Sequence, residues 1–133
     1  MARIKELISQ LLVERSHLTA KQSSALISYR TGDHLKVPDK NNRVLNEKII
    51  TKGAYYRVLE QARKNAVKSL FTVILLHSLD IIDNDSWDRM SELSAFLKAS
   101  SDAEEIDEKT ARRAVDQMQL AFDKILTIKH LIS

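Results

Sequence analysis

The near absence of glycine and proline limits what this chain can fold into. Its 133 residues include two glycines and one proline, so hairpins and tight loops lack the residues on which they usually depend. Leu, Ile, Ala, Lys, Glu and Gln, most of which favour helices, fill long periodic stretches instead. The length suits one domain with a real core. We therefore predict an all-α fold, one compact unit with a long C-terminal helix.

The composition also excludes several chemistries. The chain has no cysteine, so disulfides and thiolate catalysis are excluded, and a zinc site would need His and carboxylates alone. Residues 1–14 carry charges throughout, unlike a signal peptide. The longest apolar run, Leu70 to Leu76, is far shorter than the roughly 20 residues of a membrane span. We expect a cytoplasmic protein that makes no membrane contact.

Charge is distributed unevenly along the sequence. Residues 1–68 contain 14 Lys and Arg against 6 Asp and Glu, a net charge of +8, whereas residues 69–133 contain 7 against 12, a net charge of −5. A basic half favours a surface that binds phosphates, although charged residues also serve simply to solvate a helix face. We predict a basic DNA-binding region over residues 1–79 and an acidic packing and dimerisation region over residues 80–133.

The spacing of apolar residues is helical along most of the chain. We predict helices that begin near residues 4, 20, 52, 86 and 103, the last running from Ala103 to Leu131. Thr19 and Gln22 form a capping-box pattern before the second helix, and Thr51 is a good N-cap for the third. We also predict a loop over residues 33–43.

The segment from Val44 to Lys68 has the pattern of a helix-turn-helix DNA reader. We predict a short helix over Val44 to Lys48, a buried turn, and then the long helix with a basic and aromatic outer face. In such a motif the first helix and an apolar turn brace the second helix, whose polar side chains contact base edges in the major groove. The predicted brace consists of Ile49, Ile50, Ala54 and Val58.

The stretch from Ile50 to Lys64, ITKGAYYRVLEQARK, resembles the recognition helices of helix-turn-helix regulators. It is similar to those of sigma-factor region 4 and of response-regulator output domains, in which a capped helix of this kind follows a short helix. The loop before it is longer and more basic than the connection in those domains. The resemblance implies a helix-turn-helix fold and binding to double-stranded DNA.

Under this interpretation, polar residues of the third helix and of the preceding loop contact DNA. Arg pairs with guanine and Gln with adenine through two hydrogen bonds, whereas phosphate contacts fix the register of the protein on the duplex. An ordinary solvated helix surface would have the same residue types. The predicted base contacts are Tyr56, Arg57 and Gln61. The predicted phosphate contacts are Lys36, Lys40, Arg43, Thr51, Lys52, Arg63, Lys64 and Lys68.

Two apolar stretches predict further packing. The residues from Leu70 to Leu79 cover the helix all round, which predicts burial on every side, and the last helix has apolar residues at alternating steps of three and four. Because helix-turn-helix readers commonly pair, we predict a homodimer, although packing within one monomer explains the same pattern. The predicted seam comprises Leu75, Leu79, Val115, Met118, Phe122, Ile125, Ile128 and Ile132.

No motif in the sequence predicts catalysis, a cofactor or a metal site. The four histidines share no ligand spacing, and Gly32 and Gly53 cannot form a glycine-rich phosphate loop. We therefore predict a non-enzymatic protein that binds double-stranded DNA, either a transcriptional regulator or a chromosome- or plasmid-associated factor. The alternative is a helical adaptor or assembly protein that binds another protein through its acidic C-terminal half.

Overall fold

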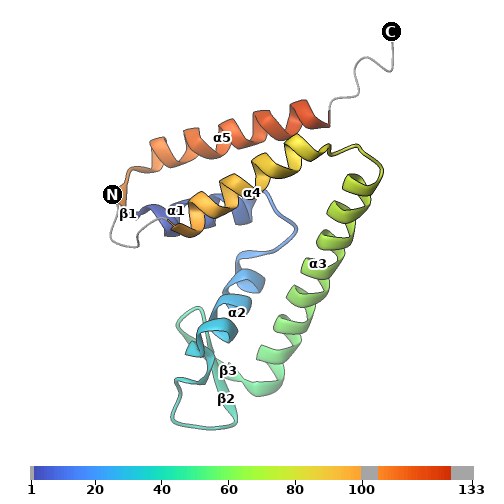
Figure 1. Ribbon diagram of the computed structural model, residues 1–133. Helices are drawn as coiled ribbons and strands as arrows, with labels where there is room; N and C mark the ends of the chain where they lie inside the picture. Colours follow the sequence, from blue (N-terminus) through green and yellow to red (C-terminus); the bar gives the residue numbers. More distant parts are fainter. Residues whose placement is uncertain (1, 100–104, 127–133) are drawn as a thin grey trace. The chain divides into compact units, whose positions relative to one another are not determined.

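The computed structural model describes residues 2–99 and 105–126, which are mostly helical, as predicted (Figure 1). None of the helices in this described part of the chain is both long and apolar enough to cross a membrane. The described α-helices are α1 (Ile4–Glu14), α2 (Ala20–Thr31), α3 (Lys52–Ser78), α4 (Asn84–Ala99) and α5 (Glu108–Ile125). The shorter elements are the 3₁₀ helix η1 (Asp33–Leu35) and the strands β1 (Ala2–Arg3), β2 (Asn42–Leu45), β3 (Lys48–Thr51) and β4 (Glu105–Ile106).

Internal contacts divide the chain into two compact units. Residues 13–71 form one, which we call the hairpin unit, and residues 1–12 and 72–133 form the other, which we call the terminal unit. The helix α3 contributes to both. The hairpin unit has 12 Lys and Arg against 5 Asp and Glu, a net charge of +7. The functional division that we predict at residue 79 from charge stays a prediction.

Residues 42–51 form a β-hairpin, and the prediction of a short helix over Val44 to Lys48 is wrong. Strands β2 and β3 are antiparallel, with Val44 opposite Ile49. The β-branched residues of this segment favour strands, and a stretch this short does not reveal whether its apolar period is helical. The predicted buried turn is wrong as well, because Ile49 is 60% exposed on β3.

The hairpin turns without glycine. Its two turn residues, Asn46 and Glu47, have positive φ angles of 52° and 64°. A two-residue turn with both φ angles positive matches the twist of the strands that it joins. Asn tolerates this conformation, whereas Glu has no side-chain hydrogen bond of the kind that favours it.

Replacing Glu47 by glycine is expected to stabilise the protein. A Cβ atom is unfavourable at a φ of 64°, and glycine removes it, so we expect Glu47→Gly to raise the free energy of unfolding by about 0.5–1 kcal/mol. Urea unfolding followed by circular dichroism measures the change. Glu47→Ala keeps the Cβ atom and is the control, which we expect to give no gain. A glycine variant that unfolds at a lower urea concentration than the wild type contradicts the strain argument.

Tyr55 is the centre of the core of the hairpin unit. Its side chain is fully buried together with Ala25 and Leu45. Its hydroxyl donates a hydrogen bond to the carbonyl oxygen of Ala25 at 2.9 Å and lies 2.9 Å from the hydroxyl of Ser28. Burial raises the pKa of the Tyr55 hydroxyl. The ring of His34, in η1, stacks on the Tyr55 ring with the centroids 5.4 Å apart. These contacts hold α2 and η1 against the start of α3.

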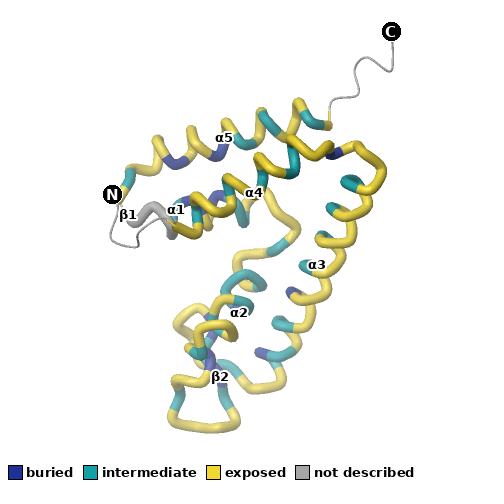
Figure 2. The backbone as a smooth tube through the Cα atoms, in the orientation of Figure 1, coloured by how far each residue is buried: buried dark blue, intermediate teal, exposed yellow. Residues whose placement is uncertain are grey.

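The core of the terminal unit lies between α1 and α5. It consists of Ile8, Leu11, Ala111 and Val115, and Figure 2 shows these buried positions on the two helices. Strand β1 pairs with β4, which places Ala2 opposite Ile106 at the start of both helices. The seam that we predict along the last helix therefore serves, in part, as the internal core of this unit.

The last helix begins later than predicted, because Asp107 caps it. The Asp107 carboxylate accepts a hydrogen bond from the backbone N–H of Thr110 at 2.7 Å, and this bond is the main reason why the pKa of Asp107 is lowered. The backbone of Asp107 is extended, as a capping residue requires. The predicted ends of this helix, Ala103 and Leu131, lie outside the described residues.

The Asp107 cap predicts a pH dependence. A carboxyl group whose pKa is lowered by folding contributes stability above its unfolded pKa of about 3.9, and this contribution is lost as the pH falls through the folded value. Asn also caps helices but does not titrate. We therefore expect Asp107→Asn to lower the Tm at neutral pH and to have little effect below the folded pKa. Thermal unfolding of the wild type and of Asp107→Asn, from neutral pH down to the acid range in which Asp107 titrates, tests this expectation. A difference in Tm that grows as the pH falls contradicts it.

Candidate nucleic-acid interface

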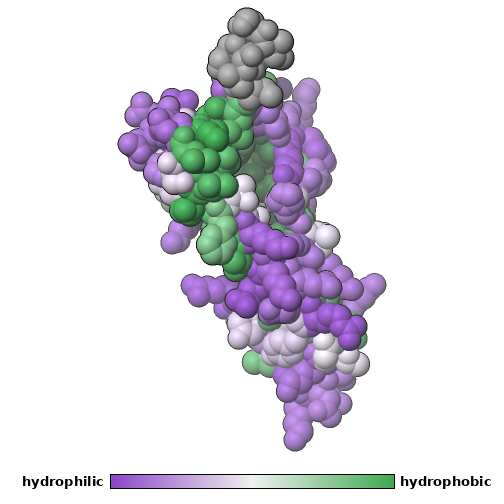
Figure 3. Space-filling view, turned by 90° about the vertical axis from the view of Figure 1, so that its right-hand side faces the viewer, coloured by the Kyte–Doolittle hydropathy of each residue, from purple (hydrophilic) through white to green (hydrophobic). Residues whose placement is uncertain are grey.

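Four polar side chains form a ridge along α3 in the hairpin unit. Successive steps of four, three and four residues separate them, so they lie within about 60° of each other on the helix and span about 16 Å along it. All four are exposed, and Figure 3 shows the hydrophilic surface over this part of the helix. The ridge consists of Arg57, Gln61, Lys64 and Lys68.

Two contacts with α2 fix the rotation of α3 and therefore the direction in which the ridge points. The first is the Tyr55 hydroxyl, which binds the Ala25 carbonyl oxygen. The second lies about 15 Å farther along the helix, where the side-chain amide of Asn65 donates a hydrogen bond to Oε1 of Gln22 at 3.1 Å. Sequence reasoning assigned Gln22 to capping α2, a role that the structure confirms, but it missed Asn65. Tyr55 lies on the face of α3 opposite the ridge, whereas Asn65 lies about 70° around the helix from the middle of the ridge.

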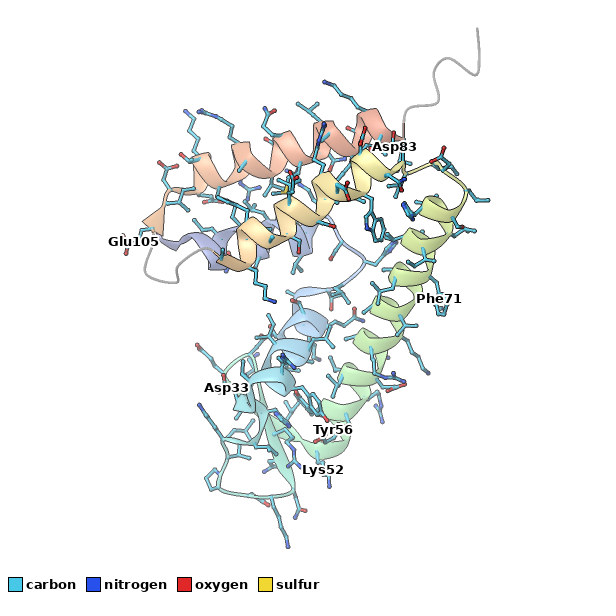
Figure 4. All side chains as sticks on the ribbon, viewed as in Figure 1. Asp33, Lys52, Tyr56, Phe71, Asp83 and Glu105 are labelled. Atoms are coloured by element: carbon cyan, nitrogen blue, oxygen red, sulfur yellow. The ribbon has the colours of Figure 1, made fainter. Side chains whose placement is uncertain are left out.

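Of the predicted base contacts, Arg57 and Gln61 lie on the ridge and Tyr56 does not. Tyr56 is half-buried, with its ring edge-to-face against the ring of Tyr55 at a centroid distance of 5.2 Å. Figure 4 shows Tyr56 on the side of α3 that faces the hairpin, and Lys52 where the helix begins. The position of Tyr56 suits packing between α3 and β2 rather than contact with a base.

Arg43, a predicted phosphate contact, is only 8% exposed. Its Nη1 donates hydrogen bonds to the carbonyl oxygens of Lys40 and Asn42, at 2.8 and 2.6 Å. Its guanidinium carbon lies 5.6 Å from the centroid of the Tyr56 ring, and its buried Nε has no hydrogen-bond partner among the described residues. Arg43 therefore fixes the start of the hairpin onto α3, and its buried side chain does not suit contact with a phosphate.

Two other predicted phosphate contacts form ion pairs at the surface. Nζ of Lys36 lies 2.8 Å from Oδ1 of Asp33, and Nε of Arg63 lies 3.3 Å from Oε2 of Glu60. The hydrogen bond between Lys36 and Asp33 raises the pKa of Lys36 and lowers that of Asp33. Pairs this exposed contribute little to stability, so a phosphate can replace the carboxylate partner.

The start of α3 presents further donors. The hydroxyl of Thr51 accepts a hydrogen bond from the backbone N–H of Ala54 at 3.2 Å, as its predicted capping role requires. Thr51, Lys52 and Lys40 are all exposed. The loop that carries Lys40 is tied to the helix, because the Lys52 N–H donates to the carbonyl oxygen of Asn41 at 2.9 Å.

The predicted dimer seam is divided between buried and exposed positions. Val115 is 1% exposed inside the terminal unit, and Met118 and Ile125 are half-buried. Leu75 and Leu79 are 55% and 61% exposed, and Phe122 is 38% exposed. The prediction that the stretch from Leu70 to Leu79 is buried on every side is therefore wrong. Ile128 and Ile132 lie outside the described residues.

Comparison with protein-family models, with curated protein sequences and with solved structures finds no match for this chain. Within residues 2–99 and 105–126, no group of three or more His, Asp or Glu side chains is placed to hold a metal ion. The candidate interface is therefore defined by its own geometry, an exposed polar ridge on a helix whose opposite face is fixed in place.

Proposed function

We propose that the hairpin unit binds double-stranded DNA and that the ridge of α3 enters the major groove. The observation that carries this proposal is the ridge itself, in which three cationic side chains and one amide side chain lie close together on the exposed surface of a helix that α2 holds in place. An α-helix fits the major groove, whose width is about 12 Å. The net charge of +7 on this unit supplies the long-range attraction to phosphates.

Roles follow from the position of each residue on the helix. Arg57 and Gln61, the ridge residues nearest the start of α3, are the proposed base contacts, because the first turns of a recognition helix reach base edges. The proposed phosphate contacts are Lys36, Lys40, Thr51, Lys52, Arg63, Lys64 and Lys68. The brace of a helix-turn-helix reader is replaced here by α2 and the hairpin. A transcriptional regulator or a chromosome- or plasmid-associated factor of the cytoplasm is the class of protein that fits this proposal.

Binding of a labelled random duplex, followed by fluorescence anisotropy at about 50 and 200 mM salt, tests the proposal. With six cationic phosphate contacts, we expect the affinity to fall by a factor on the order of 10³ between these salt concentrations, because binding releases counterions from the DNA. Absence of binding at both concentrations would reject DNA as the partner and favour the helical adaptor. Lys64→Glu is expected to weaken binding, whereas Lys109→Glu, on the exposed surface of α5, is the matched control and is expected to have little effect.

A further inference from the structure

The second half of α3 has an exposed apolar stripe. Its members recur at the spacings of one helical face, three, four, seven and eight residues after the first. They belong to one uninterrupted helix, so helical geometry alone places them together. Figure 3 shows this apolar surface, and Figure 4 shows Phe71 pointing away from the helix. The stripe consists of Val67 (38% exposed), Leu70 (66%), Phe71 (72%), Ile74 (56%) and Leu75 (55%).

The stripe is large enough for a protein interface. At roughly 150–200 Å² for each large apolar side chain, these exposed fractions leave on the order of 500 Å² of apolar surface on one helix face. A patch of this size lies at the upper end of what monomeric proteins expose. Two copies of the stripe, with the residues beside them, reach the roughly 1,200 Å² at which specific interfaces begin.

We propose that this stripe pairs with the same stripe of a second copy of the chain, with the two α3 helices antiparallel. The two outermost members of the stripe are equally spaced about Phe71, since Val67 lies four residues before it and Leu75 four residues after it. An antiparallel pair related by a two-fold axis at Phe71 therefore places Val67 of one copy opposite Leu75 of the other. Such an interface is self-complementary, as a two-fold dimer requires.

Charge at the two ends of the stripe selects the antiparallel arrangement. Lys64 lies seven residues before Phe71 on the exposed surface, and the exposed Asp80 follows the end of α3. In an antiparallel pair, Lys64 of one copy approaches Asp80 and the helix C-terminus of the other, both of which attract a cation. In a parallel pair, Lys64 would instead approach Lys64 of the other copy, and like charges repel.

The pairing also sets the distance between the two ridges, which matters for DNA binding and rests on the proposed function. The ridge lies about a quarter turn around α3 from the stripe, and the two-fold axis of an antiparallel pair is perpendicular to both helices, so both ridges lie on the same side. Gln61 is ten residues before Phe71, which puts the two copies of Gln61 roughly 30 Å apart along the paired helices at 1.5 Å per residue. This separation is close to the 34 Å between successive major grooves on one side of DNA.

Molar mass measured by light scattering, without DNA, tests the dimer separately from DNA binding. We expect the wild type to have twice the mass of the chain, and Leu70→Glu combined with Ile74→Glu to raise the dimer dissociation constant by at least about 100-fold. Leu120→Glu, at a position 53% exposed on α5, is the matched control and should leave the dimer intact. A wild type that stays monomeric at about 100 μM, or a dimer that the double variant does not weaken, overturns the proposal.

Cysteine cross-linking tests the orientation, because the chain has no cysteine of its own. We expect oxidation to cross-link a mixture of Val67→Cys and Leu75→Cys chains into heterodimers, since a disulfide needs Cα atoms about 4.4–6.8 Å apart. Each single variant alone should cross-link poorly. If each variant instead forms disulfide-linked homodimers efficiently and the mixture forms no heterodimers, the pair is parallel and the antiparallel arrangement is overturned. Circular dichroism of every variant checks that it is folded.

Discussion

Tyr55→Ala is expected to lower the free energy of unfolding by about 3–5 kcal/mol, the cost of replacing a large buried aromatic side chain by alanine. The substitution removes the ring on which His34 stacks and the hydroxyl that binds Ala25 and Ser28. Because a typical domain is stable by 5–15 kcal/mol, this loss threatens the folding of the hairpin unit. Urea unfolding, followed by circular dichroism, measures it.

One variant separates the contribution of the Tyr55 ring from that of its hydroxyl, and a second variant is the control. Tyr55→Phe keeps the ring but leaves the hydroxyl of Ser28 without this partner, and we expect a loss of about 1–2 kcal/mol. Tyr29→Ala removes a ring that also lies near His34, at a centroid distance of 5.0 Å, but is 54% exposed. Its effect should be well below that of Tyr55→Ala. Equal losses for Tyr29→Ala and Tyr55→Ala would show that the core is not centred on Tyr55.

The helices were predictable because their apolar period persists over many residues. The capping box before α2 was predictable too, since it depends on local chemistry, and the N–H of Gln22 donates to the Thr19 hydroxyl at 3.0 Å as predicted. The late start of α5 could not be predicted, because the two residues before its Asp107 cap form β4 and pair with β1, which is far away in the sequence.

The hairpin was missed for a physical reason that concerns its turn. Scarcity of glycine argues against tight turns only where glycine is needed, and here Asn46 and Glu47 adopt positive φ angles instead. The strand residues Val44, Ile49 and Ile50 fit both a short helix and a strand by their spacing. Their pairing across the turn decides between the two, and no local rule of sequence reports it.

The exposure of the candidate site was predicted in part. The helical wheel places Arg57, Gln61 and Lys64 outside and Tyr55 inside, as the structure confirms. The wheel cannot show that the hairpin covers one flank of α3, so Tyr56 was predicted to be more exposed than it is. Arg43 was placed in a loop, and nothing in the spacing of a loop indicates that its side chain packs on Tyr56. Hydrophobicity alone likewise predicted burial for the stripe that includes Phe71, which is 72% exposed.

Arg57→Ala and Lys64→Ala are expected to weaken DNA binding in different ways. If Arg57 binds a guanine through two hydrogen bonds worth about 1–3 kcal/mol, its removal lowers the affinity for the preferred duplex by about 10–100-fold and relaxes the preference at that base pair. Removal of Lys64, a phosphate contact, should weaken all duplexes by a similar factor and reduce the slope of log affinity against log salt by about one. Selection from a random duplex library first identifies the preferred sequence, and anisotropy titrations then compare it with single-base changes.

The comparison is informative because Arg57 and Lys64 share one ridge, both are exposed, and each substitution removes one positive charge from α3. Because Lys64 also lies near the proposed dimer contact, light scattering first checks that both variants keep the oligomeric state of the wild type. Loss of charge alone then predicts the same outcome for both variants, and the base-contact assignment of Arg57 depends on the difference between them. Lys109→Ala, on the exposed surface of α5, removes a charge from the terminal unit and should change neither the affinity nor the salt slope appreciably. If Arg57→Ala and Lys64→Ala weaken every duplex by the same factor, α3 binds the DNA backbone without reading its sequence, and the ridge serves phosphate binding alone.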